Sequence, residues 1–166
     1  MATQQLIDSL LLLDEYHRDM LVIGETKKTA IINNDVEKLI EVMNQESKVM
    51  KQIEKAEGER ISACQAFLQE KGIKSQLNLT ITELIRLVFD PEEKKHLQQA
   101  QSRLSATLDQ LKELNDLNQK LLEQSLNFID YSLDLLGGRS DDEITYQHPG
   151  GKTGGIHRPG WFDTRA

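Results

Sequence analysis

The chain has 166 residues and a formal net charge of −7, enough for one domain with an acidic surface. Phosphate groups repel such a surface, so nucleic acid is not an expected partner. The single cysteine, Cys64, excludes an intrachain disulfide and fits a reducing compartment. Three prolines, 5% aromatic residues and 28% charged residues are typical of an all-helical protein.

Neither a signal peptide nor a membrane span is expected. The apolar run near the N-terminus contains Asp8, Asp14 and Glu15 and follows no basic segment, which is not the pattern of a secretion signal. No stretch approaches twenty uncharged apolar residues, the length needed to cross a bilayer as a helix. The sequence therefore predicts a cytoplasmic protein that does not insert into membranes.

Residues 3–32 have the spacing of a first helix. Its apolar side chains recur at helical intervals on one face: Leu6, Leu10, Leu13, Met20 and Ile31. The run of four leucines from Leu10 to Leu13 covers more than one face, which indicates several neighbouring helices. Gly24 weakens the helix by up to about 1 kcal/mol relative to Ala, and marks either a close helix approach or a soft point.

A second helix is predicted over 35–70. Asn34, with Glu37 three residues later, has the spacing of a capping box that starts a helix. The apolar residues of this segment have heptad spacing: Leu39, Val42, Val49, Ile53, Ala56, Ala63 and Phe67. Glu46 and Arg60 fall in the same seam. Since buried charges are costly unless paired, we expect these two to set the register or to lie at the edge of the seam.

Gly72 is a natural terminator of the second helix. Thr80 and Glu83 then have capping-box spacing, which predicts a short helix over 80–89. Its expected apolar face closes one end of the helical hairpin and consists of Leu84, Ile85, Val88 and Phe89.

The longest predicted helix covers 91–136. Asp90 can cap its start, Pro91 suits the first helical position, and Gly137 can end it. No Pro or Gly lies between these signals, so about 46 residues at about 1.5 Å each make a rod of roughly 70 Å. This length is typical of a coiled coil or a long helical bundle rather than of an ordinary globular helix.

Two apolar stripes follow this rod. The first seam contains Leu97, Leu104, Leu108, Leu111, Leu122, Ile129 and Leu136, and the second stripe, about one residue around the helix, contains Leu114, Leu117, Leu121, Phe128 and Leu135. Together they are wider than a two-stranded seam requires, so the rod should contact at least two helices, or one helix and an external partner. Either both stripes belong to the core, or the second is partly open for a partner.

The composition changes after Gly138. Residues 139–166 contain half of all the glycines and two of the three prolines and show no apolar periodicity, which predicts a flexible C-terminal tail. The tail nevertheless carries Tyr146, Trp161 and Phe162. Isolated aromatic residues in a flexible segment are typical of a docking segment that orders on binding, although a simple spacer explains them equally well.

We find no pattern that predicts catalysis, a metal site or a cofactor. Asp14 with His17, and Glu93 with His96, resemble halves of a carboxylate-bridged di-metal motif, but such a site needs further inward carboxylates. Gly151-Lys152-Thr153 lacks the upstream glycine of a phosphate-binding loop. The sequence therefore indicates a protein that is not an enzyme and binds other proteins.

Three segments resemble the FlgN-type flagellar export chaperones. Residues 34–39 (Asn-Asp-Val-Glu-Lys-Leu), with Glu46 and residues 57–60, are similar to the second helix of that family, and residues 117–126 are similar to its final helix. The tail segment 145–150 (Thr-Tyr-Gln-His-Pro-Gly) and the ending 163–166 are similar to its C-terminal pattern. The resemblance covers nearly the whole chain.

The resemblance implies a cytoplasmic, non-enzymatic chaperone that holds hook-associated proteins of the hook–filament junction and delivers them to the export gate protein FlhA. A spare apolar stripe on a long helix can bury the apolar face of such a substrate. By position, the candidate substrate-binding residues are Leu114, Leu117, Leu121, Phe128, Tyr131 and Leu135. Tyr146 is the main candidate for export-gate docking, followed by Trp161 and Phe162.

The expected architecture is an all-α protein of long antiparallel helices, in a coiled-coil or up-down bundle over residues 1–138, with the tail at 139–166. The main alternative function is a helical-bundle scaffold or adaptor outside flagella that forms a homo-oligomer through its wide apolar face.

Overall fold

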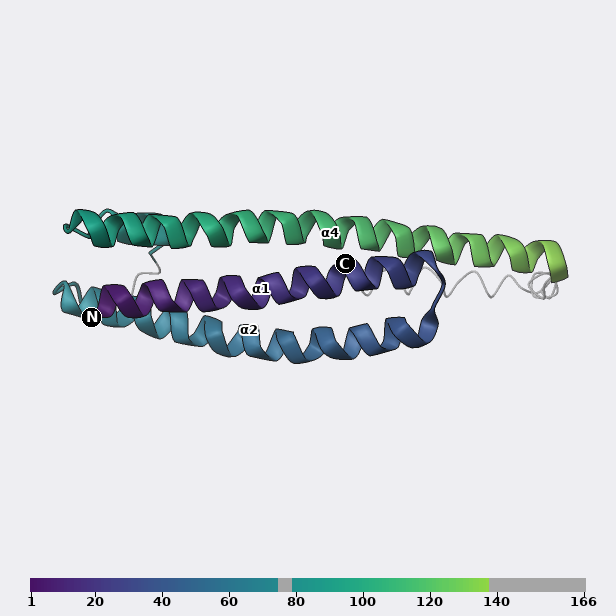
Figure 1. Ribbon diagram of the computed structural model, residues 1–166, viewed down its shortest axis with the longest axis horizontal. Coiled ribbons are helices and arrows are strands. Elements are labelled where there is room, and N and C mark those ends of the chain that lie inside the picture. The colour runs from purple at the N-terminus through teal and green to yellow at the C-terminus, as the bar shows by residue number, and fades with distance from the viewer. Residues whose placement is uncertain (75–78, 138–166) are drawn as a thin grey trace, which may run out of the picture. The chain divides into compact units, whose positions relative to one another are not determined.

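The computed structural model describes residues 1–74 and 79–137, which contain four α-helices and no β-strand (Figure 1). The all-α fold with long packed helices is therefore as expected. The chain divides after Leu122 into a first compact unit, Met1–Leu122, which we call the body, and a second unit that begins at Glu123. The tail expected at 139–166, with Tyr146, Trp161 and Phe162, lies outside the described residues.

Helices α1 (Ala2–Ile32) and α2 (Val36–Glu70) form an antiparallel hairpin. At one end the Ala2 backbone N–H donates to Glu70 Oε2 at 3.2 Å. Toward the other end, Lys27 Nζ lies 3.2 Å from Glu46 Oε1. Both contacts fit almost the same antiparallel alignment of α1 with α2, so the two helices stay side by side along their length.

The turn between α1 and α2 differs from the expected one. Asp35, not Asn34, caps α2, and its carboxylate accepts a hydrogen bond from the Lys38 N–H at 3.0 Å. Asn34 has a φ of 55° and ends α1 instead, with its own N–H donating to the Ile31 carbonyl. A residue in the left-handed conformation that closes one helix is not in the extended conformation that capping the next helix requires.

The end of α2 follows the sequence signal. Gly72, with a φ of 77°, donates its N–H to the Gln69 carbonyl at 3.0 Å, and the Ile73 N–H reaches the Leu68 carbonyl at 2.9 Å. This pair of hydrogen bonds is the Schellman arrangement, in which a left-handed residue satisfies the last carbonyls of a helix.

Helix α3 is shorter than the predicted 80–89 segment and covers only Ile81–Ile85. Its capping box is present: Thr80 Oγ1 accepts from the Glu83 N–H at 3.2 Å, and Glu83 Oε2 accepts from the Thr80 N–H at 2.9 Å. Because the helix ends at Ile85, Phe89 is not on its apolar face and is 83% exposed. The Lys71 ammonium lies 5.4 Å from the centre of the Phe89 ring.

Helix α4 covers Pro91–Gly137, one residue longer than predicted at its C-terminal end. Asp90 caps it, with Oδ2 accepting from the Glu93 N–H at 2.9 Å. The helix is continuous, although Leu122 is the last residue of the body.

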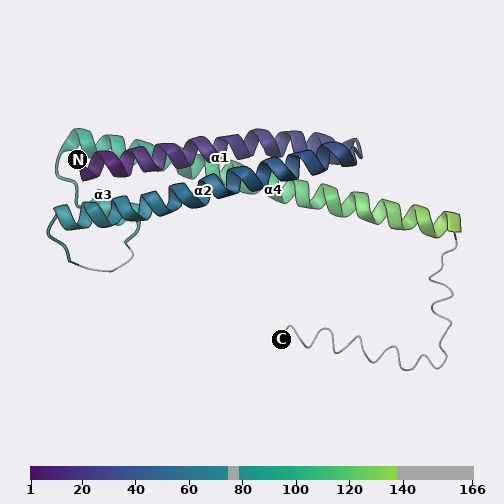
Figure 2. The ribbon, with the colours of Figure 1, turned by 90° about the horizontal axis from the view of Figure 1, so that it is seen from below.

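The main hydrophobic core lies at one end of the body, where the start of α1, the end of α2, α3 and the start of α4 meet (Figure 2). Its most deeply buried side chains come from all four helices or the turn after α3: Leu6, Leu10, Phe67, Leu84, Val88 and Leu97. Along α2, all the predicted seam positions are buried or half-buried. The two charges in that seam form ion pairs, Glu46 with Lys27 and Arg60 with Glu57.

Candidate functional site

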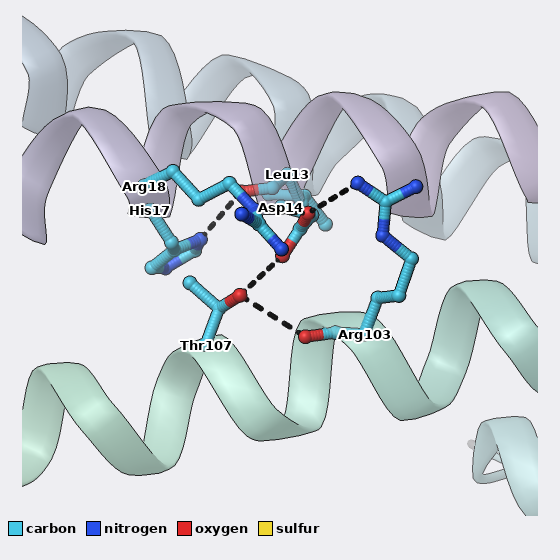
Figure 3. A network of polar contacts seen from close by, with 6 residues as sticks. All are labelled: Leu13, Asp14, His17, Arg18, Arg103 and Thr107. Carbon is cyan, nitrogen blue, oxygen red and sulfur yellow. Dashed lines mark hydrogen bonds and ion pairs between the residues drawn. The ribbon is translucent and has the colours of Figure 1, made fainter.

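A buried carboxylate joins α4 to α1 in the body (Figure 3). Thr107 Oγ1 on α4 lies 2.5 Å from Asp14 Oδ1 on α1, and both residues are almost fully buried. Arg18 Nε donates to Asp14 Oδ2 at 2.8 Å, and a second guanidinium, that of Arg103, lies 3.6 Å from the same oxygen. The negative charge in the interface is therefore paired with two cations and a hydroxyl donor, as a buried charge requires.

The surroundings of Asp14 keep it ionised. Burial alone would raise the pKa of its carboxyl group, but the hydrogen bonds from Thr107 and Arg18 and the charges of Arg18 and Arg103 together lower that pKa below its ordinary value of 3.8. Thr107 Oγ1 also lies 3.0 Å from the Arg103 carbonyl oxygen. Since a hydroxyl donates only one proton, its donation to the charged carboxylate is the stronger of the two interactions.

In the structure, Asp14 bonds to Thr107 and Arg18, and His17 contacts a backbone carbonyl. His17 Nδ1 lies 2.7 Å from the carbonyl oxygen of Leu13, its neighbour one turn back on α1 (Figure 3). Among the described residues, no group of three or more His, Cys, Asp or Glu side chains is placed to hold a metal ion. The role of Asp14 in this structure is to attach α4 to α1.

Gly24 marks a second attachment of α4 to α1. A Cβ atom at residue 24 would lie 2.6 Å from Leu114 Cδ2, so the absence of a side chain allows α4 to approach. The buried Asn118 amide donates from Nδ2 to the Gly24 carbonyl at 2.9 Å. Of the two interpretations of Gly24 that the sequence left open, close helix approach is correct. The two attachments show that α1 and α4 run parallel, because Asp14 precedes Gly24 on α1 as Thr107 precedes Asn118 on α4.

The predicted substrate-binding residues fall into two groups. In the body, Leu114 is buried against Gly24, Leu121 is half-buried and Leu117 is 42% exposed. In the second unit, Phe128, Tyr131 and Leu135 are exposed by 60–67%. Leu114 therefore takes part in helix packing, and the accessible members of the predicted set lie from Leu117 onward.

A further row of apolar side chains on α4 was not among the predicted binding residues. Starting from the half-buried Leu122, it continues at steps of four, three, four and three residues and contains Leu126, Ile129, Leu133 and Leu136. These four side chains are 49–83% exposed. Ile129 and Leu136 were expected in the core as part of the first seam, and that expectation is wrong for both. We call Leu122–Leu136 at this spacing the α4 stripe. The regular heptad spacing could have identified it from sequence, because Leu126 and Leu133 occupy the alternate positions between Leu122, Ile129 and Leu136.

The α4 stripe and the predicted binding residues lie on neighbouring faces of one helix. Phe128 and Leu135 each precede a stripe residue by one position, and one residue turns an α-helix by about 100°. This part of α4 therefore exposes apolar side chains over more than half of its circumference, enough to contact two helices of a partner. Residues 123–137 also contain three acidic residues and neither Lys nor Arg.

An exposed apolar helix surface of this size is typical of a site that binds another protein. A family model described as FlgN protein matches residues 1–154. The chain belongs to the FlgN family. Members of this family are flagellar export chaperones rather than enzymes, and they bind hook-associated proteins.

The chain is also similar to a protein of Bacillus subtilis. The uncharacterized protein YvyG of Bacillus subtilis (strain 168) is 31% identical over 136 residues, which are 82% of this chain and 81% of the relative. No solved structure gives a significant match. Across the described part of the chain, none of the helices combines the length and apolar character that crossing a membrane requires.

Proposed function

We propose that this FlgN-family protein is a cytoplasmic export chaperone that binds hook-associated proteins through the C-terminal part of α4. Binding there prevents their premature self-association before secretion. The observation that carries the proposal is the set of exposed apolar side chains between Leu126 and Leu136, on a helix whose first thirty residues pack into the body. A helix with apolar residues on two faces can cover an amphipathic helix of a substrate as helix-in-groove packing.

The family match supports this function over a scaffold outside flagella, because it extends over most of the chain, including α4. The polar residues between the apolar ones in 123–137 keep the free surface soluble, and they favour reversible binding. Release is necessary, since a chaperone must surrender its substrate for export.

The test is a binding titration of the full chain with the C-terminal segment of a hook-associated protein. Leu121→Ala and Phe128→Ala together should weaken binding about tenfold or more, because large side chains at the centre of an interface dominate its energy. Phe128 is 67% exposed and Leu121 half-buried, so the free variant should keep its helicity in circular dichroism. Leu108→Ala is the matched control, because Leu108 is an exposed leucine of α4 within the body. Loss of fold without a separate binding defect would mean that these residues belong to the core.

Delivery to the export gate is assigned to the tail. We propose that residues 139–166 dock on the cytoplasmic domain of FlhA, with Tyr146 as the main anchor and Trp161 and Phe162 as secondary anchors. The family match supports this order, because it ends at residue 154 and so includes Tyr146 but neither Trp161 nor Phe162.

Deleting 139–166 should leave substrate binding largely intact and weaken binding to the FlhA domain, and Tyr146→Ala should reproduce part of that loss. Equal binding of the full and truncated chains to the FlhA domain would make the tail a spacer. If the truncated chain instead loses the hook-associated protein, the tail belongs to the substrate site.

A further inference from the structure

Helix α2 exposes a second row of apolar side chains beside its buried seam. Val36, Ile40, Met43 and Met50 follow one another at heptad spacing, with Ser47 in the remaining position, and they are 45–64% exposed. We call Val36–Met50 at this spacing the α2 stripe. Two methionines in such a row favour a binding surface, because the flexible thioether side chain adapts to different partners.

The α2 stripe is part of a longer heptad row that the fold buries at its other end. Continued at the same spacing, the row reaches Cys64, which is half-buried, and Leu68, which is 5% exposed in the main core. At the core end, therefore, this face of α2 is buried or half-buried. Between Val36 and Met50, no described residue buries this face of α2 to the same extent, and its apolar side chains are 45–64% exposed.

The α2 stripe matches the α4 stripe in spacing and length. Both follow steps of four, three, four and three residues, and both extend over fourteen residue steps, about 21 Å of helix. Two helices with apolar residues at this spacing pack as a two-stranded coiled coil, in which the side chains of each fill the gaps between those of the other.

The charges beside the two stripes are complementary. Lys48, Lys51 and Lys55 lie on the outer side of the α2 stripe, and none of them forms an ion pair with another described residue. Beside the α4 stripe are Glu123, Asp130 and Asp134, with no basic residue in 123–137. Glu37 and Glu41 also lie on this side of α2, beside the start of the stripe, so the lysines are concentrated at its C-terminal end. Opposite charges beside a coiled-coil seam set the choice of partner and its orientation.

We propose that the α2 stripe is the docking surface for the α4 stripe of a second copy of this chain. In a twofold-symmetric dimer the contact forms twice, since each copy supplies one stripe of each kind. Within a single chain, α4 is unbroken from Pro91 to Gly137 and its Asn118 is bonded to α1. Because the two stripes match in spacing and length and Lys51 and Glu123 carry opposite charges, a second copy of the chain is the occupant that we propose.

The same charges select an antiparallel contact. Lys51 directly follows Met50, and Glu123 directly follows Leu122, so the two charged residues occupy the same edge of their respective stripes. Equivalent edges face one another only when the two helices run in opposite directions. In the parallel arrangement Lys51 would face the edge that contains Ser125 and Ser132, which carry no charge.

This dimer covers the α4 stripe next to Phe128 and Leu135. If the proposed function holds, on which this step rests, a hook-associated protein displaces the second copy, and the free chaperone does not expose its binding surface to other partners. The dimer contact itself does not depend on the identity of the substrate.

The first test is sedimentation velocity of the full chain over a concentration series, where the wild type should pass from monomer to dimer. Ile40→Glu with Met43→Glu should remain monomeric where the wild type is mostly dimeric. Gln45→Glu with Gln52→Glu is the matched control, because it adds the same charge on the exposed opposite face of α2 and should dimerise like the wild type. A wild type that is monomeric throughout, or a stripe variant that dimerises normally, overturns the proposal.

The second test is charge exchange. Lys51→Glu or Glu123→Lys alone should weaken the dimer several-fold at low salt, and the two together should restore it, because the pair re-forms between copies. If the double variant dimerises no better than the single ones, the antiparallel contact is wrong. Adding the hook-associated segment should shift the wild-type dimer to a complex with the segment. A dimer that persists when the segment does not bind at all refutes the proposed function and leaves the α2–α4 contact standing.

Discussion

Thr107 and Asp14, which are 93 residues apart in the chain, share a hydrogen bond of 2.5 Å inside the interface between α4 and α1. Thr107→Val preserves the shape of the side chain but removes the donor, so the buried carboxylate keeps its charge with one partner fewer. We expect the free energy of unfolding of the body to fall by about 1–3 kcal/mol in urea denaturation. Thr107→Ser, which retains the hydroxyl, is the control and should cost clearly less. Equal losses in both variants would mean that packing of the Thr methyl group, not the hydrogen bond, matters here.

The lowered pKa of Asp14 predicts how stability depends on pH. Burial opposes ionisation of Asp14, but Thr107, Arg18 and Arg103 outweigh it, so its pKa in the folded protein lies below 3.8. A carboxyl group with a depressed pKa contributes stability that is present above the unfolded value and is lost as pH falls through the folded value. The stability difference between wild type and Asp14→Asn should therefore be large at about pH 6 and smaller at about pH 3.

A second carboxyl group provides the comparison for the pH experiment. The hydrogen bond from Arg60 lowers the pKa of Glu57, but the Glu57 side chain is 44% exposed, so solvent screens that pair. Glu57→Gln should change the acid dependence less than Asp14→Asn. If the two variants have the same effect, the burial of Asp14 does not increase its contribution to the pH dependence of stability.

Gly24 and Leu114 should show strong energetic coupling. Gly24→Ala gains up to about 1 kcal/mol of helix propensity, but its Cβ would overlap Leu114 Cδ2 at 2.6 Å, and such overpacking costs about 1–3 kcal/mol. The single change should therefore destabilise the body. In a Leu114→Ala background the overlap is absent, and the same glycine change should stabilise. A double-mutant cycle by thermal or urea unfolding measures the difference, and additive effects would show that α4 does not approach α1 closely at Gly24.

Local sequence signals identified most of the helix ends. Gly72 and the Thr80–Glu83 capping box are decided by hydrogen bonds within a few residues, and both are present in the structure. Asn34 and Asp35 are both good capping residues, and the choice between them depends on how α1 ends, which the spacing to Glu37 does not determine. We expected Phe89 on the apolar face of α3 because the capping box that starts this helix does not determine where the helix ends.

Contacts between distant helices were not predictable in the same way. Nothing in the sequence links Asp14 to Thr107. The spacing of Asp14 and His17 resembled half of a metal motif, which the sequence did not complete, and it gave no indication of a contact between helices. Leu126 and Leu133 had a detectable heptad spacing, but whether a heptad row is buried or exposed depends on which helices lie beside it. For the same reason Leu114, although in a predicted binding stripe, is buried against Gly24.

The last prediction concerns the stability of α4 along its length. From Leu97 to Asn118 the helix contributes buried side chains to the body, whereas from Leu126 to Leu136 its apolar side chains are exposed. An isolated helical segment of about 15 residues is marginal in water, because most helix stability in proteins comes from packing. Backbone amides of residues 126–137 should therefore open with a much smaller free energy than those of residues 97–118.

Hydrogen–deuterium exchange on dilute, monomeric protein measures this difference. We expect protection of residues 126–137 to be lower by about a hundredfold or more, which corresponds to about 2.7 kcal/mol in opening free energy. Saturation with a hook-associated segment should raise the protection of 126–137 and leave that of 97–118 nearly unchanged, because only the former gains a packing partner. Uniform protection along α4 in the free monomer would show that its C-terminal part is already stabilised by packing, which would remove the physical basis for a binding surface there.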